Sequence, residues 1–467
     1  MLNDYPLPRY LMFRPLLLGV AVFVAGCTQT RPVDAGTETG DVPGGPTETP
    51  TPAGLPPVVQ GGAPCIDGKA TPAPTEAGAT ADGPYDCLGV DLLAHVPLSA
   101  MGAPSSANDI WGWTDPTTNR EYALVGLSDG TFFVDVTTPT APVLLGKLPT
   151  ATVATVWRDI KVYRDHAFIV SEAREHGMQV FSLAHLRGLT ADPARRFTAD
   201  ARYTGVTNAH NIAINEDSGF AYIVGATTRG ADMPASCAAP GAHVVNIQDP
   251  LNPVFAACFS DVDKDASPVT APGYTHDIQC ITYDGPDTDY TGREVCVASN
   301  EDVVTFFDVT DKARIRTISQ AAYPNDAYTH QAWFTEDRRY VVGNDELDEQ
   351  SGLVPHQRSL VFDSSDLDNP EFLFAYDSGI TTIDHNLYIR NGLSYQSNYE
   401  SGLRIVDTRT IAQGRMDEVA FFDTYPQATT AQFNGQWSNY PYFRSGIVIA
   451  NDINNGLFVL QPDALRR

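Results

Sequence analysis

His385-Asn386-Leu387 and Gly402-Leu403-Arg404-Ile405-Val406-Asp407 are copies of two motifs that decide the fold of this chain. The first motif is a polar pair that opens an alternation of apolar residues. The second is a hydrophobic strand that ends in Asp or a similar residue. Each motif occurs seven times, at spacings between 44 and 66 residues. Spacings of this size are typical of four-stranded units that repeat as propeller blades. The sequence therefore predicts an all-β fold, a seven-bladed β-propeller.

The polar pairs supply two columns of residues, one for each position of the pair. The first position holds Asn108, Arg158, His210, His276, His330, His385 and Trp437. The second position holds Asp109, Asp159, Asn211, Asp277, Gln331, Asn386 and Ser438. The innermost strands of a propeller line its central channel, so we expect each column to form a ring at one depth.

The last unit has no room after Gln461 for an outer strand of its own. The outer strands of the other units are expected at 143–148, 195–203, 254–259, 313–318, 371–376 and 418–425. Residues 91–98 precede the first polar pair in the way that those strands precede theirs. We therefore expect this N-terminal strand to close the propeller, because closure removes an exposed sheet edge.

Residues 1–26 are expected to be a lipoprotein signal peptide. The apolar run 16–26 follows Arg9 and Arg14, and it is too short to span a bilayer. Val24-Ala25-Gly26-Cys27 resembles a bacterial lipobox, whose Cys is lipidated and becomes the mature N-terminus. An ordinary secretory signal is the alternative, and Met12 is an alternative start.

Thr28 follows the lipobox, and by resemblance to Gram-negative lipoproteins a residue other than Asp there favours the outer membrane. The expected location is thus the bacterial envelope, at the outer membrane or cell surface, through a lipid anchor on Cys27. Residues 27–83 are rich in Thr, Pro, Ala and Gly, so they are predicted to form a disordered tether. The propeller is expected to occupy residues 84–467.

The formal net charge of −27 argues against nucleic acid and anionic lipid surfaces as partners. Contact with a membrane is then expected only through the lipid anchor. The expected partner is a protein, a glycan or a small molecule, and the chain is expected to be a monomer.

Six cysteines remain once Cys27 carries a lipid, and an even number in an exported chain favours disulfides. Order along the chain allows 15 pairings. Proximity favours Cys65–Cys87, Cys237–Cys258 and Cys280–Cys296, while buried free thiols are the alternative.

The second motif also carries a resemblance. Gly402-Leu403-Arg404-Ile405-Val406-Asp407 resembles the LVIVD repeat of bacterial surface proteins. The region 65–461 is similar to the choice-of-anchor B family, in stretches such as Cys87-Leu88-Gly89-Val90-Asp91 and Tyr274-Thr275-His276-Asp277-Ile278. This resemblance implies an exported propeller whose anchor varies between members, and it implies no reaction.

Four of the ten histidines share the first position of the polar pair: His210, His276, His330 and His385. Imidazole is a common ligand of Fe, Mn, Cu and Zn, so four facing rings could converge on one transition metal. The alternative is that these side chains only fill the channel and bind water or backbone groups. Asn108, Arg158 and Trp437 complete the ring, where Arg158 and Trp437 would suit an anionic or sugar-like ligand or act as a plug.

The second position has two interpretations. Asp109, Asp159, Asn211, Asp277, Gln331 and Asn386 could orient the imidazoles from behind. The interpretation we favour is that they bind backbone N–H groups where each blade begins.

Two acidic segments stand out, and the first of them is a candidate for Ca²⁺. Asp261-Val262-Asp263-Lys264-Asp265 has alternating carboxylates but lacks the Gly and distal Glu of an EF-hand. Asn344-Asp345-Glu346-Leu347-Asp348-Glu349 is interpreted as a solvated hairpin tip.

The leading functional hypothesis is a surface binding or scaffold protein that uses its loops and channel mouth. The alternative is a metal-dependent enzyme with a four-His site in the channel, acting on a small anionic or polysaccharide substrate. The sequence contains no phosphate loop, nucleophile elbow or HExxH motif, so no motif of this kind decides between the two hypotheses.

Overall fold

The computed structural model describes residues 62–72, 83–228, 234, 237–261 and 273–465, all within the unit 55–467. These residues form β-sheets, with helical structure only in short 3-10 turns. The turns are η1 (Leu98–Met101), η2 (Leu183–Leu186), η4 (Thr288–Tyr290), η5 (Ile411–Gln413) and η6 (Asp463–Leu465). Among the described residues no helix is long and apolar enough to cross a membrane. The all-β prediction is confirmed.

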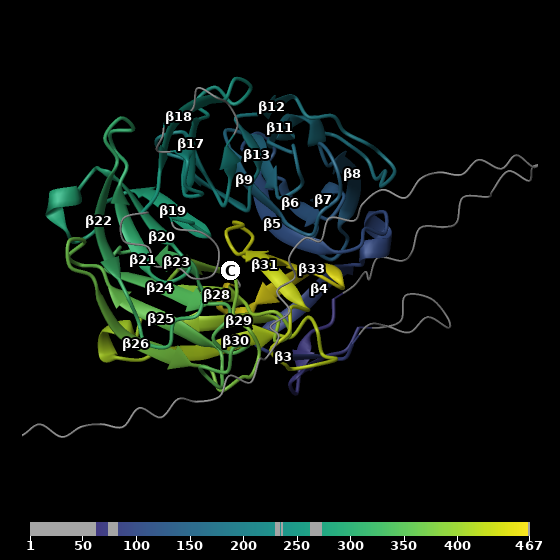
Figure 1. The fold of residues 1–467 in the computed structure, drawn as a ribbon. Helices are drawn as coiled ribbons and strands as arrows, with labels where there is room; N and C mark the ends of the chain where they lie inside the picture. The colour runs from purple at the N-terminus through teal and green to yellow at the C-terminus, as the bar shows by residue number, and fades with distance from the viewer. Residues whose placement is uncertain (1–61, 73–82, 229–233, 235–236, 262–272, 466–467) are drawn as a thin grey trace, which may run out of the picture. The chain divides into compact units, whose positions relative to one another are not determined.

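Six sheets have four antiparallel strands each, in the order that a propeller blade requires (Figure 1). The first sheet contains β5 (Ala107–Thr114), β6 (Glu121–Leu127), β7 (Gly130–Asp135) and β8 (Val143–Pro149). The second contains β9 (Arg158–Tyr163), β10 (His166–Ser171), β11 (Met178–Ser182) and β12 (Ala201–Tyr203). The third contains β14 (Asn211–Asn215), β15 (Phe220–Val224), β17 (Ala242–Asn246) and β18 (Val254–Phe259).

The next sheets follow in chain order. The fourth sheet contains β19 (Asp277–Thr282), β20 (Glu294–Ser299), β21 (Val304–Asp308) and β22 (Arg316–Ala321). The fifth contains β23 (Thr329–Phe334), β24 (Tyr340–Asp345), β25 (Arg358–Asp363) and β26 (Glu371–Asp377). The sixth contains β31 (Gln436–Tyr440), β32 (Val448–Asp452), β33 (Gly456–Pro462) and the N-terminal strand β4 (Val90–Val96). A separate two-stranded sheet pairs β13 (Val206–Asn208) with β16 (Thr227–Thr228).

The remaining sheet corrects the predicted count. It contains β27 (Leu387–Arg390), β28 (Leu393–Ser397), β29 (Leu403–Asp407) and β30 (Asp417–Phe422), and it is extended by β3 (Tyr85–Leu88), β2 (Lys69–Ala70) and β1 (Cys65–Ile66). The structure therefore has six regular four-stranded blades rather than the seven expected. The seventh sheet departs from the pattern because N-terminal strands pair with the outer edge of β30.

The innermost strands form a closed ring. β5 contacts β9, β9 contacts β14, and the contacts continue through β19, β23, β27 and β31 back to β5. The ring places the polar pairs, which begin each of these strands, around one central channel. Hydrophobic residues pack between adjacent sheets, as where Ile110, Val125 and Phe132 meet Leu457 and Val459.

Closure by an N-terminal strand is confirmed. β4 pairs antiparallel with β33, with Ala94 opposite Val459 and Leu92 opposite Leu460. In Figure 1 the two ends of the colour scale meet at this pair, purple-blue β4 beside yellow β33. The pairing covers the edge that β33 would otherwise expose.

The glycines that open the second motif have a steric reason. Gly402 has φ of +71°, and a Cβ there would lie 2.3 Å from the carbonyl oxygen of Phe422 on β30. Gly456 has φ of +94°, and its Cβ would lie 2.6 Å from the carbonyl of Val96 on β4. Glycine is therefore required where the third strand starts beside the outer strand.

All three favoured disulfides are present: Cys65–Cys87, Cys237–Cys258 and Cys280–Cys296. Cys280 and Cys296 are direct partners in the pairing of β19 with β20. Cys65–Cys87 ties β1 to β3, and both β1 and β2 fall inside the predicted tether 27–83. The tether prediction is thus wrong for these strands, because this hairpin pairs with β3 and is cross-linked to it.

Candidate functional site

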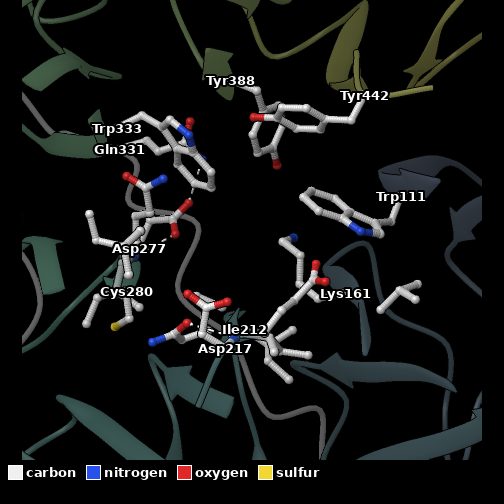
Figure 2. Close-up of a pocket in the computed structure, with 18 of the residues that line it drawn as sticks. Trp111, Lys161, Ile212, Asp217, Asp277, Cys280, Gln331, Trp333, Tyr388 and Tyr442 are labelled. Carbon is white, nitrogen blue, oxygen red and sulfur yellow. Dashed lines mark hydrogen bonds between the residues drawn. The ribbon is translucent and has the colours of Figure 1, made fainter. Parts of the chain in front are cut away.

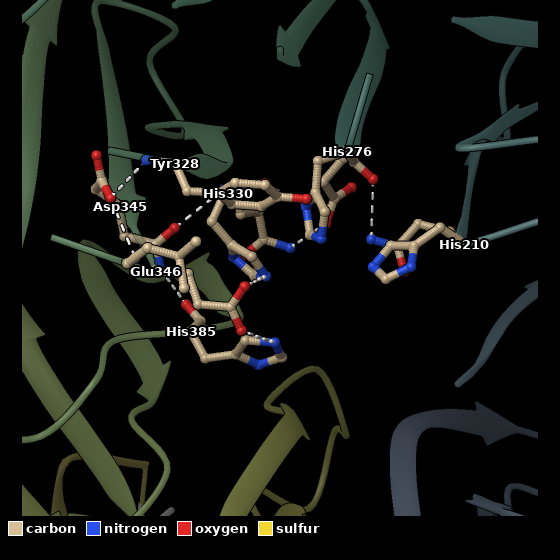
Figure 3. A network of polar contacts seen from close by, with 12 residues as sticks. His210, His276, Tyr328, His330, Asp345, Glu346 and His385 are labelled. Carbon is tan, nitrogen blue, oxygen red and sulfur yellow. Dashed lines mark hydrogen bonds and ion pairs between the residues drawn. The ribbon is translucent and has the colours of Figure 1, made fainter. Parts of the chain in front are cut away.

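The four predicted histidines lie side by side at the start of successive inner strands. Their ring centroids are 4.4 Å apart between His210 and His276, 4.3 Å between His276 and His330, and 4.3 Å between His330 and His385. His276, His330 and His385 are each at most 4% exposed. The column therefore forms an arc of imidazoles at one depth of the channel (Figure 3).

Two of these rings have a defined tautomer. The Nδ1 of His276 lies 2.8 Å from the carbonyl oxygen of His330, and the Nδ1 of His385 lies 2.6 Å from that of Trp437. A carbonyl only accepts, so both Nδ1 atoms must carry the proton. The Nε2 atoms of His276 and His385 then present lone pairs, the arrangement found in histidines that bind a metal.

Glu346 joins this arc, and the sequence interpretation missed it. Its carboxylate lies between His330 and His385, with Oε2 at 3.8 Å from Nε2 of His330 and Oε1 at 3.5 Å from Nε2 of His385 (Figure 3). The hydroxyl of Tyr399 donates to Oε1 at 2.6 Å. Glu346 follows the end of β24, in the segment interpreted as a solvated hairpin tip, but its side chain is only 13% exposed.

The charges of this group follow from burial. Burial lowers the pKa of His385 to about 3, and burial together with neighbouring imidazoles lowers the pKa of His276 and His330 well below the usual value. Burial raises the pKa of Glu346 to about 7, although the hydrogen bond from Tyr399 opposes this. Neutral imidazoles with exposed lone pairs are the form that binds a cation.

Ligand atoms of His276, His330 and Glu346 all lie within 4.8 Å of one another. His385 touches the other oxygen of the same carboxylate. His210 differs, because its Nδ1 pairs with Oε1 of Glu172 at 2.5 Å. Burial by itself would lower the pKa of His210, but Glu172 outweighs burial and raises it. The geometry thus groups three of the four histidines with Glu346 and assigns His210 to an ion pair.

The other first-position residues bind protein groups. Nδ2 of Asn108 donates to the carbonyl of Val156 at 3.0 Å. Nε of Arg158 donates to the carbonyl of Leu127 at 3.1 Å, and Nη1 lies 3.1 Å from Nε2 of His176. Burial lowers the pKa of Arg158 to about 10. Arg158 is therefore a buried plug residue rather than an open anion site.

Trp437 packs its ring against His385, at 5.1 Å between centroids and in an edge-on orientation. Its carbonyl is the acceptor that sets the tautomer of His385. Trp437 thus supports the histidine arc through its ring and backbone.

Several second-position side chains bond to a neighbouring inner strand. Asp159 accepts from the N–H of Ile212 at 2.7 Å, and Gln331 accepts from that of Leu387. Asp109 accepts from the N–H of Ile160 at 3.3 Å in the same way. Asn211 donates to the carbonyl of His276 at 3.2 Å, and Gln331 donates to Asp277 at 2.9 Å. The bonds to Asp109, Asp159 and Gln331 from N–H groups are of the kind that we favoured, and all of these contacts run from blade to blade.

Lys161 is a buried cation beside the second-position side chains, which together form a polar layer. The sequence interpretation missed this cation as well. Its Nζ lies 2.5 Å from Asp159 and 3.5 Å from Asp109, and 4.5 Å from the ring centre of Trp111. Burial raises the pKa of Asp109 well above its usual value, whereas Lys161 and hydrogen bonds overcome burial and lower that of Asp159. Lys161 and Asp159 therefore form the closer charged pair, whereas burial favours the neutral form of Asp109. Side chains alternate between the two faces of a strand, so Lys161 shares a face with Asp159. This alternation could have predicted that Lys161 points into the channel.

A cavity of about 380 Å³ adjoins the polar layer (Figure 2). Aromatic rings of Trp111, Trp333, Tyr388, Tyr440 and Tyr442 line it, from several inner strands and the segment after β31. Their centroids lie close together, for example 5.1 Å between Trp333 and Tyr388 and 5.4 Å between Tyr440 and Tyr442.

Polar groups of the cavity come from Lys161, Asp217, Asp277, Gln331 and Arg338. Burial raises the pKa of Asp277 to about 6. Asp277 and Gln331 directly follow His276 and His330 in sequence, so the polar layer separates the cavity from the histidine arc.

Only the first residue of the segment 261–265 that was considered for Ca²⁺ is described. Asp261 is buried and accepts from Thr305 at 3.2 Å and from Gln320 at 2.5 Å, so its carboxylate is already bound by protein donors. Positions 262–265 lie outside the described residues, as do the signal peptide 1–26, Cys27 and the tether up to residue 61.

No family model matches the chain, and no curated protein matches it. Among solved structures, the β-propeller domain of Myceliophteria thermophila Cps50 (Swd1) is similar, at 10% identity and a TM-score of 0.47, over 76% of this chain and 96% of that chain. The computationally designed Ika8 protein is similar at 8% identity and a TM-score of 0.42, over 76% and 82%. These similarities carry no argument about a ligand. The resemblance to the choice-of-anchor B family is supported only at the level of a propeller fold.

Proposed function

We propose that this protein is an extracytoplasmic binding propeller that holds one divalent transition metal in its channel. His276, His330 and Glu346 would be ligands, with His385 against the second oxygen of the same carboxylate. The predicted four-His set is thereby replaced by histidines and a carboxylate. Zn²⁺, Fe²⁺ and Mn²⁺ suit imidazole combined with carboxylate.

The facing of acceptor atoms supports this proposal most strongly. His385 is neutral and its Nδ1 proton is committed to Trp437, yet its Nε2 lone pair lies 3.5 Å from Oε1 of Glu346. Two acceptors that face each other in a buried site repel unless a cation or proton lies between them. A metal ion would satisfy Glu346 and the imidazoles together, whereas one proton could serve only one of these pairs.

Metal content tests the proposal. The full-length chain, without a histidine tag, is purified, dialysed against a chelator and titrated separately with Zn²⁺, Mn²⁺ and Fe²⁺ under anaerobic conditions. We expect about one ion per chain after reconstitution, measured by elemental analysis. A chain that retains none of these metals would show that protons, not a metal, separate the acceptors.

A second candidate function is the binding of a small polar ligand or glycan in the aromatic cavity. Its volume of about 380 Å³ lies within the range of ligand pockets, roughly 300–1,000 Å³. Aromatic rings beside a few polar groups favour sugars and similar polyhydroxylated molecules. Calorimetric titration with a panel of neutral and acidic oligosaccharides tests this, with Trp333→Ala as the cavity variant. Binding that is unchanged in the variant would place the ligand elsewhere.

The cellular setting is part of the proposal. The lipobox around Cys27 and the resemblance to choice-of-anchor B proteins support a lipid anchor at the bacterial outer membrane or cell surface. The same metal would support the enzymatic alternative only if a substrate reached an open coordination position.

A further inference from the structure

A second acidic group lies in the loop that supplies Glu346. Asp348 and Glu349 follow β24 by a few residues, and Asp384 lies just before β27. Their side chains are buried, with relative exposures of 0% for Asp348, 8% for Glu349 and 2% for Asp384. One carboxylate oxygen from each lies within 4.8 Å of the others. The segment interpreted as a solvated hairpin tip is therefore turned inward, and that interpretation is wrong.

The carboxylates of this cluster have few hydrogen-bond donors. Apart from a contact between the Asp348 and Glu349 carboxyl groups and one with the Glu349 backbone, both carboxylate oxygens of Glu349, Oδ1 of Asp348 and Oδ1 of Asp384 are buried without a hydrogen-bond partner. By contrast, Asp345 nearby accepts from the N–H groups of Ala327, Tyr328 and Leu347 and from the hydroxyl of Tyr323. Buried carboxylate oxygens are costly without a partner, so three clustered carboxylates with four such oxygens point to a missing positive group.

The fixed charges near the cluster do not balance. Arg358 is the cation in contact, and its Nε donates to Oδ2 of Asp348 at 2.5 Å. Its backbone N–H donates to Oδ2 of Asp384 at 3.0 Å. Both contacts use the Oδ2 atoms and do not involve the Oδ1 atoms. Three carboxylates and one guanidinium carry a formal charge of −2 when all are ionised, and Asp345 adds to the repulsion.

We propose that Asp348, Glu349 and Asp384 form a binding site for a hard divalent cation, and specifically for Ca²⁺. A divalent ion neutralises the formal charge of −2, and carboxylate oxygens are its preferred ligands. This site is separate from the proposed transition-metal site, since it contains no imidazole and uses different residues. By holding the segment after β24, Ca²⁺ would also hold Glu346 in the channel.

The choice of Ca²⁺ over Mg²⁺ rests on burial. Mg²⁺ keeps several water ligands and requires near-octahedral geometry, whereas Ca²⁺ accepts irregular sets of protein oxygens at about 2.3–2.6 Å. Oxygens on opposite sides of a Ca²⁺ ion are then separated by up to about 5 Å. The three carboxylates meet this spacing within 4.8 Å and are nearly inaccessible to solvent.

Calorimetry and thermal unfolding of the full-length chain test the site. After dialysis against EGTA at pH 7, the wild-type chain is titrated with CaCl2 and, separately, with MgCl2. We expect one Ca²⁺ per chain and a melting temperature that is higher in Ca²⁺ than in EGTA. Glu349→Gln should keep the shape of the side chain but weaken Ca²⁺ binding by at least about tenfold. Asp384→Asn provides a second variant should Glu349→Gln fold poorly.

The control is Glu371→Gln, which removes an exposed carboxylate on β26 and should leave Ca²⁺ binding unchanged. Equal melting temperatures in Ca²⁺ and EGTA, without binding heat, would overturn the proposal and mean that protons neutralise the cluster. Binding of Mg²⁺ at equal affinity would overturn the choice of ion. Glu346→Gln distinguishes the two proposals, because it should impair the transition metal and spare one Ca²⁺ per chain.

Discussion

Nδ1 of His276 donates its proton to the carbonyl oxygen of His330, 2.8 Å away on the next inner strand. The bond joins two blades and at the same time fixes the lone pair of His276 on Nε2. His385 does the same with the carbonyl of Trp437. The histidine column therefore has a structural role and a ligand-presenting role in the same atoms, and variants must separate the two.

Glu346→Gln is the substitution that separates them best. It keeps the side-chain shape but removes the anionic ligand, so transition-metal affinity should fall by about 10- to 100-fold or more. His276→Gln should lower it similarly. The measurement is competition with a chromogenic chelator. His210→Gln and the exposed His185→Gln are controls and should bind normally; a large loss in His210→Gln would restore the four-His arrangement.

Lys161 and Asp159 form a buried pair whose loss should be visible in stability. Lys161→Met leaves Asp159 charged and unpaired, which should lower the free energy of unfolding by about 3–5 kcal/mol. Adding Asp159→Asn should recover part of this loss. Urea titrations of the single and double variants give the interaction energy, and strictly additive losses would contradict the pairing.

Closure by β4 can be tested with a small change. Leu92 is fully buried opposite Leu460, so Leu92→Ala should cost about 2–5 kcal/mol of unfolding free energy. Leu88→Ala on β3 is the control, because Leu88 is 51% exposed and its loss should cost less than about 0.5 kcal/mol. Similar effects of the two variants in urea unfolding would argue against a closing role for β4.

Asp452 should make stability depend on pH. Burial raises its pKa to about 6, although bonds from Thr424, Asn455 and Asn454 oppose burial, and His95 lies near. A carboxyl whose folded pKa exceeds its unfolded value of about 3.9 favours folding at low pH and loses this contribution as pH rises through 6. Asp452→Asn should therefore improve stability relative to wild type by about 2 kcal/mol more at pH 8 than at pH 4.5. An equal difference at both pH values would show that Asp452 does not titrate as proposed.

The lipid anchor is tested by Cys27→Ser. The variant lacks the thiol that would carry the lipid, so it should leave the membrane fraction while its melting temperature stays unchanged. Fractionation of cells followed by immunoblotting measures this. Retention in the membrane fraction would mean that Cys27 is not the anchor.

The repeat motifs predicted most of the strands because each blade repeats the same alternation of buried and exposed residues. The outer strand expected at 371–376 matches β26 (Glu371–Asp377). The strand expected at 313–318 is displaced to β22 (Arg316–Ala321), because Asp311 accepts from the N–H of Ala313 and forms a turn there. Such turns are encoded by side-chain bonds that apolar patterning does not reveal.

The hairpin β1–β2 was missed although its signal was present. Asp67-Gly68 separates Ile66 from Lys69, and both turn residues have positive φ, +52° and +81°. An Asp-Gly pair between short strands is a strong hairpin signal. The Pro, Thr and Ala residues around this hairpin have the composition of a disordered segment, and the tether was predicted from that composition.

The candidate site was predictable in part. Residues at one repeat position share a depth, which placed the four histidines together. Glu346 and the cluster of Asp348, Glu349 and Asp384 were not predictable, because the loop after β24 turns inward and an acidic loop ordinarily faces water. Only the observed contacts show this turn.

Anomalous diffraction from crystals of the reconstituted protein, recorded at the absorption edge of the bound metal, tests the central claim most directly. The account predicts one anomalous peak about 2.0–2.2 Å from nitrogen atoms of His276 and His330 and from a carboxylate oxygen of Glu346. A channel without an anomalous peak at these side chains, in crystals soaked in excess metal, would contradict it.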